Sequence, residues 1–194
     1  MSTKLSEFHR TFKSNIERRR KFSLPEYKNL TEACNGDFDG EYVTPLQIEA
    51  RSATGPCLIA HNWLDAKRLE EFCLCPEKYR LLKKHGYAPW IPFNQILDLA
   101  LERADIRRQG TYMTQAFHLL PLKGKPKPKD VQKSFERITQ HEVRGRNVVA
   151  LGVPAQKVCK KFGIAFLPAP HPSDWNIPRH KRVADIAEAI KGAR

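Results

Sequence analysis

The sequence has no long hydrophobic run, few acidic residues for its size and only five cysteines. No stretch approaches the roughly 20 consecutive apolar residues that a helix needs to cross a bilayer. The first residues are polar and charged, without the apolar segment of a secretory leader. We therefore expect a soluble, intracellular protein that has no membrane partner.

The cysteine pattern does not favour a disulfide framework or a metal site. Five cysteines at irregular spacing argue against the disulfide pattern of a small secreted domain. Cys73 and Cys75 are separated by one residue, whereas zinc-binding pairs are usually two or more residues apart. We predict free, mostly buried thiols and no bound metal.

Basic residues are in clear excess. Lysine and arginine number 34 against 21 acidic residues, which gives a formal charge of +13 and a pI near 9.7. Any single basic run is better explained as solvated surface than as a phosphate contact. The total excess nevertheless indicates a polyanionic partner, and nucleic acid fits better than a membrane surface.

The length and hydrophobic content fit one domain with its own core. In residues 4–22, Leu5, Phe8, Phe12 and Ile16 recur at helical spacing and predict an amphipathic, basic helix. We expect residues 1–55 to form this helix and a connecting segment, packed on a core of residues 56–194. The sequence shows no internal repeat.

Short apolar runs alternate with helical patterns in the core. Strands are predicted at residues 56–60, 111–117, 147–151 and 164–167, and helices at 66–84, 93–104, 131–140, 154–162 and 179–191. Residues 121–129 alternate lysine with proline or glycine and predict an exposed basic loop. The alternation predicts an α/β fold: a four-stranded parallel sheet with helices on both faces.

Polar residues stand where the first and last of these strands end, and ligands of open parallel sheets bind at the carboxyl ends of the strands. The first strand ends in Ala60-His61-Asn62-Trp63-Leu64, and the last leads into His171-Pro172-Ser173. Gln115 lies between these two motifs, and Gly152 follows the third strand. In the order of these features, the chain from about Pro56 to the last helix resembles the uracil-DNA glycosylase superfamily. That resemblance implies the fold of the superfamily and an enzyme that flips a base out of DNA and hydrolyses its glycosidic bond.

In the superfamily the first motif commonly reads Gly, any residue, Asn or Asp, Pro, Gly. The match implies that Asn62 orients the attacking water and that Asp65 assists or replaces it, although the glycines and the proline are missing here. Asn62 could equally cap the following helix, and Asp65 could serve only to stabilise the helix dipole.

The second motif matches more closely. It implies that His171 donates a hydrogen bond to the departing base, that Ser173 holds phosphate and that Trp175 fills the gap left by the flipped nucleotide. The basic Arg179 and Lys181 follow on the expected DNA face. Without the motif, Trp175 would be read as a packing residue.

Three further residues are assigned to the base pocket. Gln115 stands where the resemblance places an asparagine that reads the pyrimidine edge, and His61 lies in the first motif. Of the aromatic candidates for stacking on the base, Trp90 is preferred over Tyr87 and Phe93.

The expected chemistry needs water, an orienting group and a donor, so no cofactor is predicted. One branch of the superfamily carries an iron–sulfur cluster, but His118, Ser134 and Phe135 stand at the corresponding positions here. No lysine stands out as a nucleophile, which predicts a monofunctional glycosylase.

The altered pocket motifs favour a modified pyrimidine as the substrate, for example a hypermodified cytosine of phage DNA, and a role in antiviral defence. The alternatives are a uracil-DNA glycosylase of base-excision repair, a non-catalytic DNA-binding module with this fold, and an unrelated basic component of a ribonucleoprotein. We expect a monomer without an obligate protein partner. It should lie in the cytoplasm at the nucleoid, or in the nucleus of a eukaryotic cell.

Overall fold

The computed structural model describes residues 2–194, and their side chains from residue 6 onward. The prediction for Leu5 therefore lies outside the described side chains. In chain order the elements are α1 (Ser2–Lys21), β1 (Tyr27–Lys28), η1 (Ala33–Gly36), η2 (Pro45–Ile48), β2 (Cys57–Asn62), α2 (Ala66–Cys73), α3 (Pro76–His85), α4 (Pro92–Arg103), η3 (Arg108–Gly110), β3 (Tyr112–Phe117), β4 (Leu120–Pro121), α5 (Pro128–Ser134), the π-helical turn η4 (Phe135–Thr139), α6 (Gln140–Glu142), β5 (Val148–Leu151), α7 (Val153–Lys161), β6 (Leu167–Ala169) and α8 (Arg179–Gly192).

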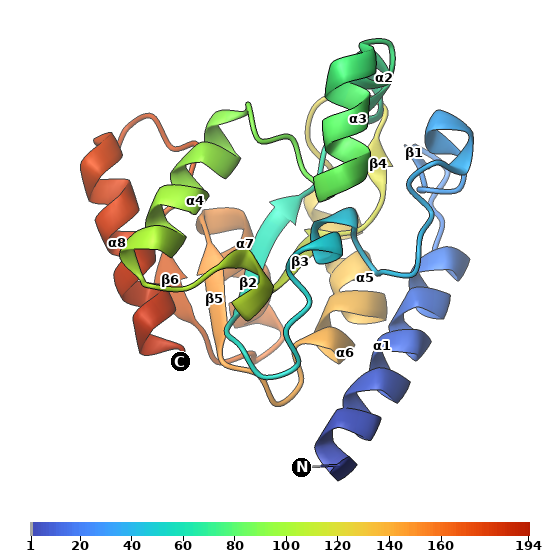
Figure 1. The fold of residues 1–194 in the computed structure, drawn as a ribbon. Helices are drawn as coiled ribbons and strands as arrows, with labels where there is room; N and C mark the ends of the chain where they lie inside the picture. The colour runs from blue at the N-terminus through green and yellow to red at the C-terminus, as the bar shows by residue number, and fades with distance from the viewer. Residues whose placement is uncertain (1) are drawn as a thin grey trace.

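The predicted parallel sheet is confirmed. Its four strands lie in the order β3-β2-β5-β6, and every neighbouring pair is parallel. In β2, Ile59 pairs with Thr114 on one side and Ala150 on the other, so three buried strands are in close register. All carboxyl ends of a parallel sheet meet at one edge, and this is the edge beneath α2 and α3 (Figure 1).

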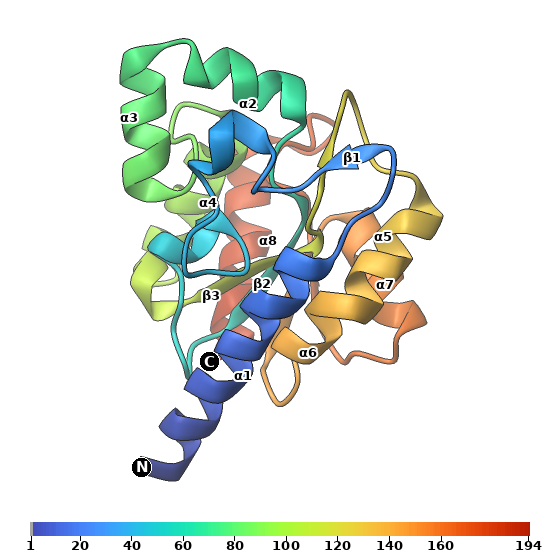
Figure 2. The same ribbon diagram turned by 90° about the vertical axis from the view of Figure 1, so that its right-hand side faces the viewer.

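Helices cover both faces of the sheet, as predicted (Figures 1 and 2). Because successive strand residues point to opposite faces, Ile59 packs with α1, α5 and α7, whereas Leu58 packs with α4 and α8. Phe12 and Ile16 of α1 are buried in the first of these layers. The amphipathic stripe of the N-terminal helix therefore contributes to the core.

The helix predicted over residues 66–84 is in fact two helices. The chain breaks at Leu74 and Cys75, and Pro76 begins α3, since proline lacks the N–H group needed inside a helix but is tolerated in the first turn. A disulfide joins Cys34 of η1 to Cys73 of α2. The prediction of free thiols is therefore wrong for this pair, whose partners are 39 residues apart in the sequence.

Two other boundaries differ from the prediction. The last strand begins at Leu167 rather than Ile164, because the N–H of Ile164 still bonds to Cys159 O and completes the end of α7. The helix predicted at residues 131–140 begins earlier, at Pro128, and widens into the π-turn η4. Within the part of the chain described, no helix is long and apolar enough to span a membrane.

Candidate active site

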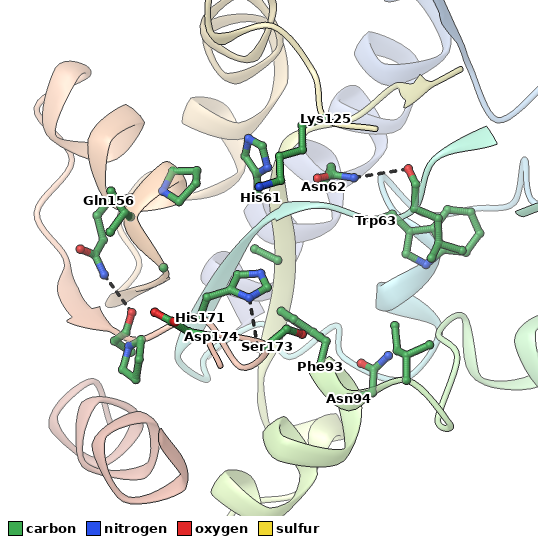
Figure 3. Close-up of a pocket in the computed structure, with 18 of the residues that line it drawn as sticks. His61, Asn62, Trp63, Phe93, Asn94, Lys125, Gln156, His171, Ser173 and Asp174 are labelled. Atoms are coloured by element: carbon green, nitrogen blue, oxygen red, sulfur yellow. Dashed lines mark hydrogen bonds between the residues drawn. The ribbon is translucent and has the colours of Figure 1, made fainter. Parts of the chain in front are cut away.

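A cavity of about 860 Å³ opens at the carboxyl ends of β2, β5 and β6 (Figure 3). The end of β2 contributes Ala60 to Asn62, the turn after β5 contributes Gly152, and the segment after β6 contributes His171. The topology thus brings residues about 110 positions apart to one site. Of the predicted site residues, His61, Asn62, Asp65, His171 and Ser173 all line this cavity.

His171 lies in a tight turn that fixes its ring. The N–H of Asp174 donates to His171 O at 2.9 Å, and Pro172 takes the second position of the turn, which suits its fixed φ. The buried guanidinium of Arg182, from α8, donates to Pro172 O. A charged donor on a turn carbonyl stabilises this backbone conformation.

Gly152 allows the chain after β5 to lie directly against His171. Its backbone has φ +84° and ψ 161°, a region that is essentially limited to glycine. A Cβ added there would lie 2.7 Å from His171 Cβ. Gln156 of α7 supports the same corner by donating to Ala169 O at 2.8 Å. Gly152 thus sets the position of the histidine.

The hydrogen bonds of His171 define its tautomer. Its Nδ1 accepts the backbone N–H of Ser173 at 3.1 Å, which leaves the proton of the neutral ring on Nε2. Burial lowers the pKa of His171, and the neighbouring His61 and the charge of Lys125 lower it further. His171 is therefore a neutral imidazole near pH 7 with an N–H donor to offer.

His61 is neutral for similar reasons. Burial is the main cause that lowers its pKa, the charge of Lys125 adds to the effect, and a hydrogen bond to Asn62 opposes it in part. Figure 3 shows the ring of His61 beside Lys125, with His171 on the other side of Lys125 in this view. The two histidines place neutral hydrogen-bonding groups on one wall.

Asn62 and Asp65 have different roles in the local structure. Asp65 caps α2 by accepting the N–H of Arg68 at 2.8 Å, so the helix-stabilising interpretation of Asp65 is supported. Asn62 does not cap that helix. Its amide donates weakly to Leu64 O at 3.4 Å, and its side chain also hydrogen-bonds to His61. The amide oxygen has a second lone pair for a water.

Hydrophobic anchoring replaces the missing glycines and proline of the first motif. Leu64 is buried beneath α2, and the indole N–H of Trp63 donates to Gly86 O at 3.0 Å. These anchors fix the turn from β2 into α2. The departure from the usual motif is therefore compatible with a defined loop.

Of the three aromatic candidates for stacking on the base, Phe93 lines the cavity, whereas Trp90 and Tyr87 do not. Trp90 packs edge-on against Phe72, 5.1 Å between ring centroids, and does not line the cavity. Phe93, at the start of α4, lines it and lies 5.2 Å from the ring of His171. The structure thus favours Phe93, in the first turn of α4, over Trp90 as the aromatic residue nearest to His171.

Gln115 does not line the cavity either. It is buried in β3, paired with Ala60 of the cavity wall, and its Oε1 has no hydrogen-bond partner in the described part of the protein. A buried acceptor without a donor is uncommon. The side chain is thus one layer behind the wall to which it was assigned.

The predicted DNA-contacting residues lie beside the cavity on the chain that follows His171. Trp175 is 77% exposed, with the guanidinium carbon of Arg182 5.7 Å from its ring. Arg179 and Lys181 are exposed at the start of α8, and Lys181 pairs with Asp185 at 3.5 Å. The exposure of Trp175 excludes the alternative that it is a core residue.

Lys125 is a cavity residue that the sequence analysis missed. It belongs to the basic loop between β4 and α5, which was interpreted only as exposed surface. The alternation of lysine with proline gave no indication which lysine would face the site. Only the folded loop distinguishes Lys125 from its neighbours.

One comparison with known families bears on this geometry. The profile of the uracil DNA glycosylase superfamily matches residues 80–194, which is more than half of the chain. The protein belongs to the uracil-DNA glycosylase superfamily. No curated protein matches the chain at a significant level.

The superfamily match covers Phe93, Gln115 and His171 but begins after the first motif. The assignment of Asn62 therefore depends on its place in the cavity and not on the matched range. At the positions of the iron–sulfur branch, Ser134 Oγ accepts the N–H of His118 at 2.9 Å. Neither side chain is a thiolate, so these residues do not fit such a cluster.

Proposed function

We propose that the protein hydrolyses the N-glycosidic bond of a pyrimidine nucleotide flipped out of DNA and leaves an abasic site. Membership of the superfamily suggests DNA glycosylase activity in general. The observation that carries the specific mechanism is the neutral His171, whose Nδ1 accepts the Ser173 N–H and whose Nε2–H has no partner among the described residues. Such a donor stabilises the negative charge that develops on the departing base.

Asn62 completes the reaction from the end of β2. Its oxygen can hold and orient a water for attack on C1′ of the sugar, where positive charge develops. Phe93 offers an aromatic face for the flipped base beside His171. Trp175, exposed next to the site, would fill the space that the nucleotide leaves in the stack.

We further propose that the base is a modified pyrimidine. The cavity of about 860 Å³ is at the upper end of the range that holds drug-sized ligands, roughly 300–1,000 Å³, and exceeds what a bare pyrimidine ring needs. Hypermodified cytosines, as in phage DNA, have this added bulk. Such a substrate would place the enzyme in antiviral defence rather than repair, acting in the compartment that holds the DNA.

The test compares oligonucleotides that differ in one base: uracil, cytosine, 5-hydroxymethylcytosine or glucosylated hydroxymethylcytosine. Abasic sites are detected by strand scission in hot alkali. Release of a modified cytosine supports both parts of the proposal, and release of uracil alone contradicts the modified-base part. Binding of DNA without release of any of the four bases would instead support the non-catalytic module.

Two variants test the mechanism. Asn62→Ala and His171→Ala should each lower the rate of base release by about 10²- to 10³-fold while DNA binding is retained. His9→Ala is the matched control, because His9 is exposed on α1 and does not line the cavity. Full activity of His171→Ala would refute the proposed donor.

A further inference from the structure

Lys125 is set apart from the other lysines of its loop. It lines the cavity together with Gly124, whereas Lys123 and Lys127 do not. Lys127 is paired with Glu26 on the outer surface. Lys125 makes no hydrogen bond or ion pair with any residue in the described part of the chain, so its amine is available at the cavity rim.

The loop holds this amine at the site. Pro126 is buried and anchors the chain directly after Lys125, and Gly124, with φ +78°, turns the chain directly before it. A Cβ on Gly124 would meet nothing within 4 Å, so the turn is open on that side. The result is a fixed anchor with a long, adjustable side chain beside His61 and the entrance to the cavity (Figure 3).

We propose that Lys125 is the nucleophile of a second activity of this site, an abasic-site lyase that cleaves the DNA strand after the base has left. The inference rests on the proposed function, because that reaction supplies the abasic sugar in the same cavity. It differs from the sequence-based prediction of a monofunctional enzyme. The substrate class is an abasic deoxyribose in DNA.

The chemistry balances without an external oxidant or metal. His61, a neutral imidazole, takes one proton from the ammonium group of Lys125. The free amine attacks C1′ of the ring-opened aldehyde and a C–N bond forms. The carbonyl oxygen then leaves as water, with one proton from the amine and the proton that His61 returns, to give a protonated imine. Loss of a C2′ proton to solvent then breaks the C3′–O bond, whose electron pair leaves with the 3′ phosphate. Hydrolysis of the imine regenerates Lys125.

An ordinary amine can carry out this reaction if it is held next to the aldehyde. Positioning alone raises the effective concentration of a reacting group by several orders of magnitude. Burial lowers the pKa of His61, so the proton acceptor beside Lys125 is available near pH 7. An unpaired amine group, its position and a neighbouring proton acceptor thus occur together at the cavity rim.

The test uses DNA that already contains a single abasic site, so that it does not depend on base release. The full-length protein is incubated with this DNA in the presence of sodium borohydride, which reduces an imine to a stable protein–DNA adduct. We expect a covalent adduct, cleavage on the 3′ side when borohydride is omitted, and modification of Lys125 when the adduct is mapped by mass spectrometry.

The variants Lys125→Arg and Lys125→Gln should reduce the adduct by about 100-fold. Lys123→Arg and Lys127→Arg, in the same loop, should leave it unchanged, since neither side chain lines the cavity. Three results would overturn the proposal: no adduct with the unaltered protein, an adduct that persists in Lys125→Arg, or modification of a different lysine. None of these depends on whether the protein releases bases, which the oligonucleotide assay measures separately.

Discussion

The position of His171 depends on the absence of a side chain at residue 152, and Gly152→Ala tests this dependence. The added Cβ would lie 2.7 Å from His171 Cβ, whereas ordinary contact begins near 3.4 Å. The histidine turn must therefore move by about 0.7 Å, since Gly152 is itself held by its N–H bond to Ala169 O at 2.9 Å. A misplacement of about 1 Å at a catalytic group costs about 10²-fold in rate.

The substitution also strains the backbone, and a matched control separates the two effects. Alanine in the glycine-only conformation of residue 152 costs about 1–3 kcal/mol of stability. Gly145 also has a positive φ, +74°, but a Cβ there would meet nothing within 4 Å. Gly145→Ala should therefore lose about 1–2 kcal/mol of stability and keep its activity.

The assay is single-turnover release of the preferred base, with the thermal midpoint of each variant measured in parallel. We expect Gly152→Ala to remain folded at the assay temperature and to release the base about 50- to 100-fold more slowly than Gly145→Ala. If a folded Gly152→Ala protein releases the base at the unaltered rate, the close approach of Gly152 to His171 is not what positions the histidine.

Three further predictions follow from the same structure. Cys34→Ser removes the disulfide and should lower the free energy of unfolding by about 4 kcal/mol, because the bond closes a loop of 39 residues and limits the entropy of the unfolded chain. The thermal midpoint should fall by about 10 °C. An unchanged midpoint would disprove the bond. Arg182→Met should slow base release about 10-fold by freeing the histidine turn, whereas methionine at the exposed Lys191 of the same helix should not. Equal rates for both variants would contradict the role of Arg182. Because burial lowers the pKa of His171 and His61 below the ordinary value of 6.5, the unfolded chain binds more protons than the folded one as the pH falls below about 6.5. The urea midpoint should therefore decrease between pH 7 and pH 5, and His61→Gln should weaken that decrease.

The fold was predictable to the extent that it depends on local patterns. The apolar runs around Ile59, Met113 and Val149 are buried on both faces and bounded by polar or turn residues, which defines parallel strands. The order of strands and helices then limits the possible topologies. The break at Pro76 was also visible in the sequence, but the helical periodicity on both sides of it concealed the change of direction.

The site was only partly predictable, because strand ends and loop interiors differ in what the sequence determines. His171 and Asn62 follow strands whose ends must meet, so their convergence follows from the topology. Three other positions depend on packing in three dimensions. The loop of Lys125 and the start of α4 at Phe93 bring these two side chains to the cavity, and the packing of β3 keeps Gln115 away from it. The spacing of apolar residues in the sequence does not indicate which of these side chains face the cavity.

This difference also explains why the two ends of the site are built differently. His171 is held by backbone geometry, through the turn, Gly152 and Arg182, so small changes in sequence there are costly. Asn62 is held by packing, through Leu64 and the bond of Trp63 to Gly86 O, and packed positions tolerate other residues of suitable volume. The donor to the departing base must have a fixed position, which backbone geometry provides. The wall that contacts a variable base can change in sequence, because packing alone holds it. The unusual first motif is therefore the part of the site where a change of substrate requires the least change elsewhere.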